Sequence, residues 1–256
     1  MTLDLNADVG ESFGAYTIGD DVGLMRSVTS VNVAAGFHGG DPSVLRSTIR
    51  LARDAGAAVG AHPGFPDMAG FGRRAIDMGL DQAEDLVLYQ IAAVAGVARA
   101  EGVALQHVKP HGALYNMAAV DAALAGAIAR AVATFDRSLM LVGPCGSQLL
   151  AAGRNAGLRV AAEAFADRAY LSDGTLAPRS RPGAVLQDPD AVAARAGAMI
   201  AERRVSTLDG GILAIDADTL CVHSDTPGAS VIAALVRRRL EDQGVDIRAL
   251  GKGSAR

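Results

Sequence analysis

Four strand-like runs in the first half of the chain each end in a cluster of ionisable and amide side chains beside glycine or proline. Asp, His, Lys and Asn are the side chains that transfer protons, bind anions and hold metal ions. Because helix-like segments separate the runs, we expect their polar ends to meet at the carboxyl ends of parallel strands, as in an α/β barrel. The four runs are Leu3–Glu11, Val31–Asp41, Ala58–Asp67 and Leu105–Asn116.

The first run places Asp8 on the same face of its strand as Asp4 and Asn6, since alternate side chains of a strand point to the same side. We expect the inward face to be apolar in the depth of the barrel and polar only near its mouth. A carboxylate at that mouth could act as a general base or bind a metal. The alternative is a carboxylate that caps the next helix or binds loop amides. Glu11 is a weaker candidate for the same work.

The second and third runs each supply one histidine. His38 precedes Gly39-Gly40, where the backbone can approach a ligand closely, and His62 ends its run before Pro63-Gly64. Together with Asp8, the two imidazoles could form a divalent metal site at the barrel mouth. Either histidine alone could equally be a structural side chain at the rim.

The fourth run carries Lys109 beside Pro110, a residue that prevents further strand pairing. A lysine in the mouth could offer its cation to a carboxylate or phosphoryl oxygen, or act as a nucleophile or base if burial lowered its pKa. The alternative is a structural ion pair of Lys109 with Asp8 or Glu163. Possible polar partners that follow it are His111, Tyr115 and Asn116.

Two connections, His62–Gly79 and Asp167–Asp188, are longer than the roughly five residues usual for such loops. Long loops that follow strands and carry arginine beside glycine and proline are typical binding loops for anions. The alternative for each arginine is a solvent-exposed charge. The candidates are Arg73, Arg74, Arg179 and Arg181, with Arg168 and Glu163 at the end of the sixth strand.

The remaining pattern predicts about seven strands that alternate with helices in a single domain over residues 1–250, followed by a frayed tail at 251–256. A doubly wound sheet has the same alternation, but no glycine-rich phosphate fingerprint follows the first strand. Further strands are predicted at Leu139–Gly143, Val160–Phe165 and Gly211–Ile215. Helices are predicted to begin at Asp41-Pro42, Asp81, Asp188-Pro189 and Thr226-Pro227, and to span Val120–Phe135 and Ser147–Gly157.

Composition excludes several classes of protein. The 24 basic and 28 acidic residues give a net charge of −4 without a basic stripe, which argues against nucleic acid as a partner. No apolar run approaches the ~18 residues of a membrane span. The amino terminus lacks a secretory pattern, so we expect a cytoplasmic protein. Cys145 and Cys221 are the only cysteines and are expected to be small buried residues.

Several long motifs resemble those of the LamB/YcsF family across nearly the whole chain. That family comprises the A subunit of the prokaryotic ATP-dependent 5-oxoprolinase. The resemblance implies a distorted β/α barrel related to glycoside hydrolases and polysaccharide deacetylases. The motifs are NADVGESFG (6–14), NVAAGFHGGDP (32–42), GAHPGFPD (60–67), FGRR (71–74), VKPHGALYN (108–116), EAFADRAY (163–170) and HSDTPGA (223–229).

The resemblance also implies that the chain works with subunits B and C of that complex to open the lactam of 5-oxo-L-proline to L-glutamate, with ATP and its Mg²⁺. In this hypothesis, Lys109 stabilises developing oxyanion charge, and Asp8 with His38 or His62 transfers protons. The nucleotide would bind on the partner subunits or across the interface with them. The paired arginines would bind the anionic groups: Arg73, Arg74, Arg179 and Arg181.

Two other functions stay open on the sequence alone. Kinship of the fold suggests metal-dependent hydrolysis of N-acetyl groups or sugars, which needs a bound metal and no ATP. A non-catalytic subunit that shapes the site of its partners is the second, although a scaffold has little reason to carry so many ionisable strand ends.

Overall fold

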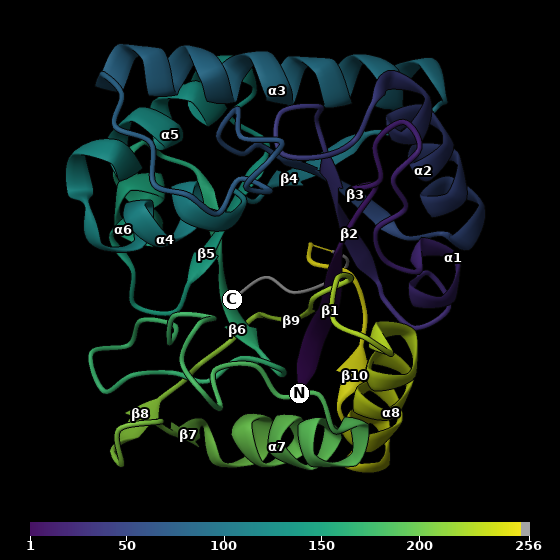
Figure 1. Ribbon diagram of the computed structural model, residues 1–256, viewed down its shortest axis with the longest axis vertical. Coiled ribbons are helices and arrows are strands. Elements are labelled where there is room, and N and C mark those ends of the chain that lie inside the picture. Colours follow the sequence, from purple (N-terminus) through teal and green to yellow (C-terminus); the bar gives the residue numbers. More distant parts are fainter. Residues whose placement is uncertain (252–256) are drawn as a thin grey trace.

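The computed structural model describes residues 1–251, in which seven parallel strands form a closed barrel (Figure 1). In order around the barrel they are β1 (Thr2–Val9), β2 (Ser30–Ala34), β3 (Ala58–His62), β4 (Leu105–Val108), β5 (Met140–Pro144), β6 (Arg159–Phe165) and β9 (Thr219–Val222). The barrel closes because β9 pairs with both β6 and β1. The predicted parallel barrel of about seven strands is therefore confirmed.

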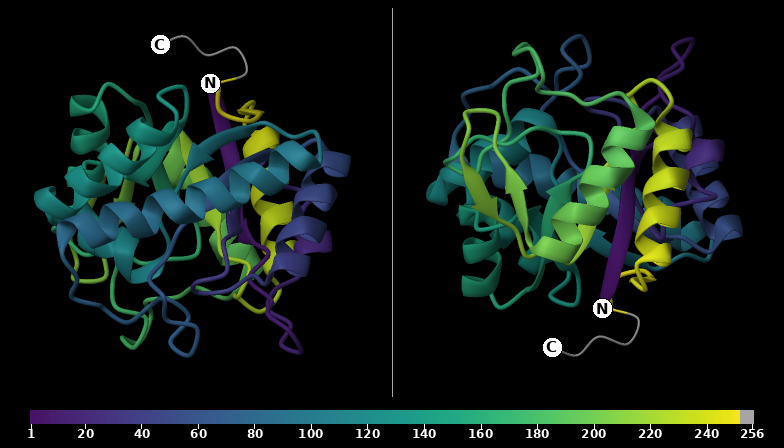
Figure 2. Two further views of the ribbon diagram at one scale, coloured as in Figure 1. Left: turned by 90° about the horizontal axis from the view of Figure 1, so that it is seen from above. Right: turned by 90° about the horizontal axis from the view of Figure 1, so that it is seen from below.

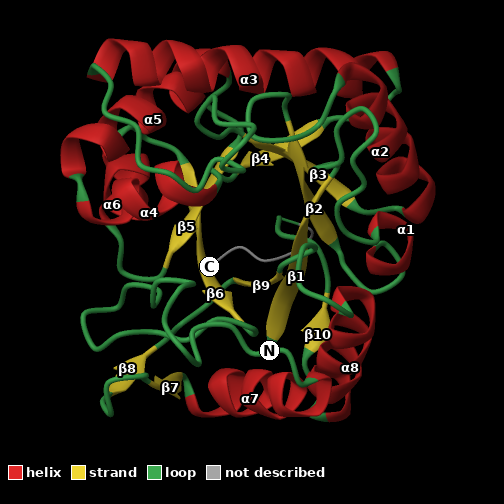
Figure 3. Ribbon diagram, in the orientation of Figure 1, coloured by secondary structure: helices red, strands yellow, loops and turns green. Residues whose placement is uncertain are grey.

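Helices enclose the barrel on its outside, as Figure 3 shows in red around the yellow strands. They are α1 (Asp21–Leu24), α2 (Pro42–Ala55), α3 (Leu80–Ala100), α4 (Gly112–Val120), α5 (Ala122–Phe135), α6 (Gln148–Asn155), α7 (Pro189–Glu202) and α8 (Ala229–Asp242). Strands β7 (Arg204–Ser206) and β8 (Ile212–Ala214) form an antiparallel pair, and β10 (Asp246–Ile247) pairs with β1. The N-terminus lies at one end of the barrel and the long loops lie at the other (Figure 2).

Three predicted helix starts are confirmed by their N-caps. The side chains of Asp41, Ser147 and Asp188 each accept a hydrogen bond from a backbone N–H in the first turn of α2, α6 and α7. These bonds satisfy amide groups that have no partner within the helix. The sequence signal is therefore reliable where a capping side chain precedes the helix directly.

Two predicted starts are wrong. Helix α3 begins after Gly79, whose N–H donates to Gln82 Oε1 at 3.2 Å, so Asp81 lies within the first turn instead of capping it. Helix α8 begins after Gly228, which has a positive φ of 76° that glycine adopts without strain. The Thr226 hydroxyl donates instead to Asp167 Oδ2 at 3.1 Å.

The prediction of a barrel strand at Gly211–Ile215 is also wrong. Residues 212–214 form β8, which pairs with β7 outside the barrel, and β9 supplies the seventh barrel strand. Helix α4 is not among the predicted helices, because its residues are apolar on nearly all sides and show no 3.6-residue alternation. Of the predicted tail at 251–256, only Gly251 belongs to the described residues.

The barrel interior carries polar side chains far below its mouth, not only at the mouth as predicted, beside a small apolar cluster of Met140, Val142 and Ala161 on β5 and β6. On β1, Leu3 and Leu5 are buried toward the helices. The inward side chains with polar or sulfur atoms include Asp4, Asn6, Asp8, Ser30, Asn32, His107, Lys109, Glu163, Thr219 and Cys221, and all are buried. A buried polar group is stable only if it is hydrogen-bonded. The deepest carboxylate, Asp4, satisfies this rule by accepting bonds from the hydroxyls of Thr29, Ser30 and Thr219.

A glycine on β3 makes room for this polar interior. A Cβ added to Gly60 would lie 2.1 Å from His107 Nε2 inside the barrel. Gly60→Ala is therefore expected to lower the free energy of unfolding by about 1–3 kcal/mol, measured by urea denaturation. The control is Gly96→Ala on α3, where a Cβ meets nothing within 4 Å. That change should raise the free energy of unfolding by about 0.5–1 kcal/mol, and equal stability of both variants would contradict the packing argument.

In the part of the chain that the structure describes, no single helix is long and apolar enough to cross a membrane. Among these described helices, α4 and α5 meet that criterion only when taken together, and the two are bent by 118° relative to each other.

Candidate functional site

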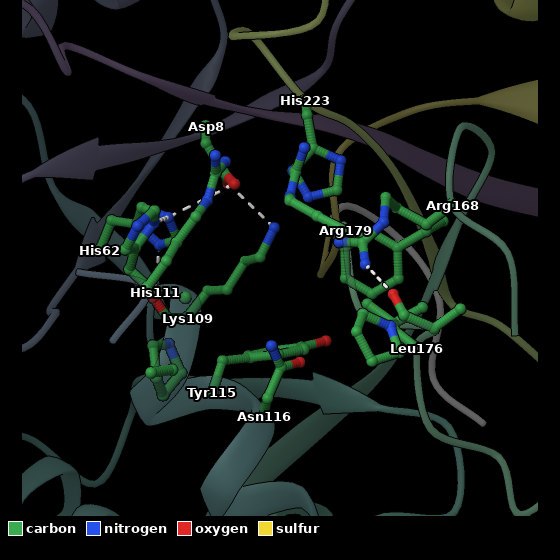
Figure 4. A pocket seen from close by; sticks show the side chains of 17 residues that line it. Asp8, His62, Lys109, His111, Tyr115, Asn116, Arg168, Leu176, Arg179 and His223 are labelled. Carbon is green, nitrogen blue, oxygen red and sulfur yellow. Dashed lines mark hydrogen bonds and ion pairs between the residues drawn. The ribbon is translucent and has the colours of Figure 1, made fainter. Parts of the chain in front are cut away.

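A cavity of about 280 Å³ opens at the carboxyl ends of the barrel strands (Figure 4). Its volume is near the lower end of the range for small-molecule sites, roughly 300–1,000 Å³. The side chains come from the ends of β1, β3, β4, β6 and β9 and from the loops that follow. They include Asp8, His62, Arg73, Lys109, His111, Tyr115, Asn116, Phe165, Arg168, Leu176, Arg179 and His223.

Lys109 follows β4 and reaches the centre of the barrel mouth. Its Nζ lies 2.9 Å from Asp8 Oδ1 and 2.9 Å from Glu163 Oε1, so the ion pair named as the alternative, with Asp8 or Glu163, is formed with both carboxylates. Burial alone would lower the pKa of Lys109, but the charges of Asp8, Cys221 and Glu163 raise it well above its usual value. Lys109 therefore remains a cation, and the alternative of a neutral nucleophile or base is not supported.

Glu163 lies beneath the cavity and forms an ion pair with Lys109. Its Oε1 accepts a bond from Asn6 Nδ2 at 2.9 Å, and its Oε2 accepts one from the Tyr115 hydroxyl at 2.6 Å. Burial and the negative charge of Glu163 raise the pKa of Tyr115 well above its usual value. Tyr115 therefore stays protonated and remains a donor, and Asn6 and Glu163 support the site without lining the cavity.

Asp8 is held in its ionised form at the cavity wall. Its Oδ1 also accepts a bond from Asn32 Nδ2 at 2.8 Å, and its Oδ2 lies 3.4 Å from His62 Nε2. Burial would raise the pKa of Asp8, but His62 and Lys109 lower it well below its usual value. His107 is hydrogen-bonded to Asn32 inside the barrel. Burial lowers the pKa of His107 to about 3, so this imidazole is neutral. Asp8 is thus the ionised carboxylate of the cavity wall.

A histidine–carboxylate pair at the end of β9 was not among the predicted site residues. His223 Nδ1 lies 3.0 Å from Asp167 Oδ1, and the imidazole stacks on Phe165 with ring centroids 5.2 Å apart. Burial would raise the pKa of Asp167, but His223 lowers it below its usual value. Because Nδ1 donates to the carboxylate, Nε2 of His223 is left for proton transfer at the cavity.

Three arginines lie on one side of the cavity, and two of them pair with the carboxylate of Asp225. Arg73 Nη2 lies 2.8 Å from Asp225 Oδ2, and Arg179 Nη2 lies 3.7 Å from Asp225 Oδ1. Burial and the charge of Arg179 lower the pKa of Arg168 to about 10. Arg168 also donates through Nη2 to the Ala177 carbonyl at 2.7 Å, which orders the loop. Such a group of guanidinium ions favours an anionic ligand.

Three predicted site residues lie away from the cavity. Arg74 points to the surface, where its Nε donates to Asp67 Oδ2 at 2.9 Å. Arg181 lines a neighbouring hollow that also contains Arg179 and Asp225. His38 is fully buried behind the cavity wall. The structure thus brings together Asp8, His62, Arg73, Lys109, His111, Asn116, Arg168 and Arg179 from the predicted set.

Within residues 1–251, two groups of side chains are close enough to share a metal ion. The first contains Glu11, His38, His62 and His111, not the predicted combination of Asp8 with His38 and His62. The second contains Asp8, Cys221 and His223. Lys109 Nζ lies 2.9 Å from Asp8 Oδ1 and 3.2 Å from Cys221 Sγ, so a cation already occupies the second group.

The two cysteines are free. Cys221 is buried as predicted, whereas Cys145 is half-buried.

Comparison with known proteins gives a consistent picture. A model of the LamB/YcsF family matches residues 3–255. The chain is 57% identical over 249 residues to the 5-oxoprolinase A subunit of Symbiobacterium thermophilum, covering 97% of this chain and 95% of that one. It is 53% identical to the protein of the same name from Tolumonas auensis, covering 97% and 99% of the two chains.

Solved structures support the same family relationship. The lactam utilization protein from Thermus thermophilus superimposes with a TM-score of 0.91 at 50% identity, covering 98% of this chain and 100% of that one. A family 4 carbohydrate esterase from Streptomyces lividans superimposes with a TM-score of 0.52 at 12% identity, covering 98% and 93%. At that identity the likeness concerns the fold alone, and it confirms the expected relation to the deacetylase fold.

Proposed function

Because the chain belongs to the LamB/YcsF family, we propose that it acts as the A subunit of a 5-oxoprolinase. In this proposal, the chain and two partner subunits, B and C, open the lactam of 5-oxo-L-proline to L-glutamate at the expense of ATP. The reaction takes place in the cytoplasm, where ATP is supplied. Two relatives at 57% and 53% identity carry that name over nearly their whole length.

The observation that carries the proposal for the site is the buried pair of Lys109 and Asp8, fixed 2.9 Å apart at the cavity wall. A lactam carbonyl is a poor electrophile, because its nitrogen donates electrons to the carbonyl carbon. Hydrolysis therefore needs a cation where the oxygen gains negative charge and a carboxylate where water loses a proton. Lys109 supplies the cation, and Asp8 supplies the carboxylate.

The chemistry that we propose uses ATP to activate the lactam. Transfer of the γ-phosphoryl group to the carbonyl oxygen makes the carbon electrophilic, and water attacks it while Asp8 accepts the proton. The C–N bond then breaks, and His223 Nε2 donates a proton to the ring nitrogen. A second water hydrolyses the acyl phosphate to give glutamate and phosphate. Lys109 stabilises the negative charge on the oxygen throughout.

The arginines fit the anionic parts of these reactants. The substrate carries one carboxylate, and the intermediate carries a phosphoryl group as well. Arg73, Arg168 and Arg179 line the cavity, and Arg181 extends the positive charge into the neighbouring hollow. We place the nucleotide and its Mg²⁺ on the partner subunits or across the interface with them, since no glycine-rich phosphate loop follows β1 in the sequence.

Growth on the substrate tests the proposal in cells. A host without 5-oxoprolinase activity would express the chain together with its two partner subunits, and 5-oxo-L-proline would be its only nitrogen source. We expect growth only when all three proteins are made. Equal growth without this chain, or no growth although all three proteins are made and folded, would contradict the proposal.

A further inference from the structure

Four buried side chains meet behind the wall formed by His62 and His111. They come from the ends of β1 to β4 and the loops that follow, and none takes part in the chemistry proposed above. One donor atom from each lies within 4.8 Å of the donor atoms of the others. They are Glu11, His38, His62 and His111.

The hydrogen bonds of two of these histidines fix which ring nitrogens carry protons. His62 Nδ1 lies 2.7 Å from the carbonyl oxygen of Lys109, and His111 Nε2 lies 2.8 Å from that of Phe71. A carbonyl oxygen only accepts, so both of these nitrogens carry hydrogen. This is the arrangement of metal-binding histidines, whose second nitrogen donates to a backbone carbonyl.

The two remaining nitrogens face each other. His62 Nε2 and His111 Nδ1 are 3.0 Å apart, and His62 Nε2 also lies 3.4 Å from Asp8 Oδ2. With both rings neutral, both of these nitrogens carry lone pairs. Such a contact is repulsive unless an electrophile, either a proton or a metal ion, lies beside both. Two donors bound to one ion at about 2 Å each are expected roughly 3 to 3.5 Å apart.

The other two side chains leave polar atoms without partners among the described residues. Both ring nitrogens of the fully buried His38 lack a hydrogen bond there, and so does Glu11 Oε1. Glu11 Oε1 lies 3.6 Å from His38 Nε2 and 3.6 Å from His111 Nδ1. Buried polar atoms without partners are costly, and coordination of one cation would satisfy Glu11 Oε1 and one of the two ring nitrogens of His38.

Glycines keep the space for these rings. A Cβ at Gly64 would lie 2.5 Å from His38 Nδ1, and a Cβ at Gly72 would lie 2.8 Å from both His111 Cδ2 and His38 Cβ. Three loops therefore approach closely enough to form a cage that larger residues would fill.

We propose that Glu11, His38, His62 and His111 bind one divalent transition metal ion of the zinc class. Three imidazole nitrogens and one carboxylate oxygen suit such an ion. A closed set of four protein ligands is typical of structural sites, so the ion holds the loops after β1 to β4 in place. The rings of His38 and His111 stack with their centroids 3.7 Å apart and their planes within 3° of parallel.

The test is direct metal binding by the folded chain, which does not depend on the proposed function. Protein treated with chelator would be titrated with Zn²⁺ while Tm is followed, and with Co²⁺ while its visible absorption is recorded. We expect about one ion per chain, a higher Tm with Zn²⁺ and a tetrahedral Co²⁺ spectrum. An unchanged Tm and the absence of that spectrum would overturn the proposal and leave a shared proton between His62 and His111.

Variants identify the ligands. Glu11→Gln and His38→Gln should each weaken Co²⁺ binding by at least about tenfold. The matched control is His107→Gln, a buried histidine whose ring nitrogens already have partners in Gln106 and Asn32. It should bind Co²⁺ as the wild type does. Unchanged affinity in both ligand variants, or an equal loss in the control, would show that the ion is not held by this group.

Discussion

The complex that carries Lys109→Met is expected to form glutamate about a hundredfold to a thousandfold more slowly than the wild-type complex. The pKa of Lys109 is raised by the carboxylates around it, so the side chain is a permanent cation at the cavity. Methionine keeps nearly the length of the side chain and removes the charge. The measurement is the initial rate of glutamate formation by the complex at saturating ATP and 5-oxo-L-proline.

The same substitution is expected to lower stability, because it leaves the buried carboxylates of Asp8 and Glu163 without their shared cation. Removal of one partner from a buried ion pair costs about 3–5 kcal/mol. A double variant, Lys109→Met with Glu163→Gln, separates the two effects. It should recover the part of the lost stability that comes from the unpaired charge of Glu163, but none of the lost activity. Recovery of activity in the stabilised double variant would show that Lys109 is only structural.

The second large effect is expected for Asp8→Asn, which should lower kcat about 10²- to 10⁴-fold with a smaller change in KM. The amide still accepts a hydrogen bond from Lys109 but cannot take a proton from water. The pKa of Asp8 is lowered in the folded chain, so its carboxylate is ionised throughout the neutral pH range. The measurement is a kcat and KM determination on the assembled complex.

The matched control is Asp4→Asn on the same strand and the same inward face. Asp4 is equally buried but lies deep in the barrel, where it accepts bonds from hydroxyl groups. Burial raises the pKa of Asp4, so replacing this carboxylate by a neutral amide removes a charge that burial already disfavours. Activity should survive Asp4→Asn, and an equal loss in both variants would contradict a specific role for Asp8.

Much of the barrel and its mouth could be predicted from local patterns. Each strand that carries Asp8, His62 or Lys109 is an apolar run that ends in polar residues, and parallel strands bring such ends together. The polar lining of the barrel depth could not be predicted in the same way. Asp4 and Asn6 are stable there because Thr219 and Glu163, more than 150 residues away in the sequence, supply hydrogen bonds.

Loop conformation explains most of the remaining differences between the predicted and the observed site residues. Arg73 and Arg74 are neighbours in the sequence, but Gly72 has a positive φ of 63° and the chain turns there. One guanidinium then reaches Asp225 beside the cavity, and the other reaches Asp67. Local spacing cannot distinguish the two residues.

His223 carries a signal in the sequence that could have identified it. It follows Thr219 and Cys221 with a period of two, so it continues the inward face of β9. The apolar run at Gly211–Ile215 has the stronger strand pattern, and the prediction based on it places the seventh barrel strand one segment too early.

The most direct test of the proposed activity is a joint measurement of glutamate and ADP formed from 5-oxo-L-proline and ATP by the purified chain, alone and with its two partner subunits. We expect turnover only in the assembled complex, with glutamate and ADP formed in equal amounts. Glutamate formed without ATP, or no turnover by folded and assembled subunits, would contradict the proposal. Metal-dependent release of acetate from N-acetyl sugars would then become the better explanation of the same cavity.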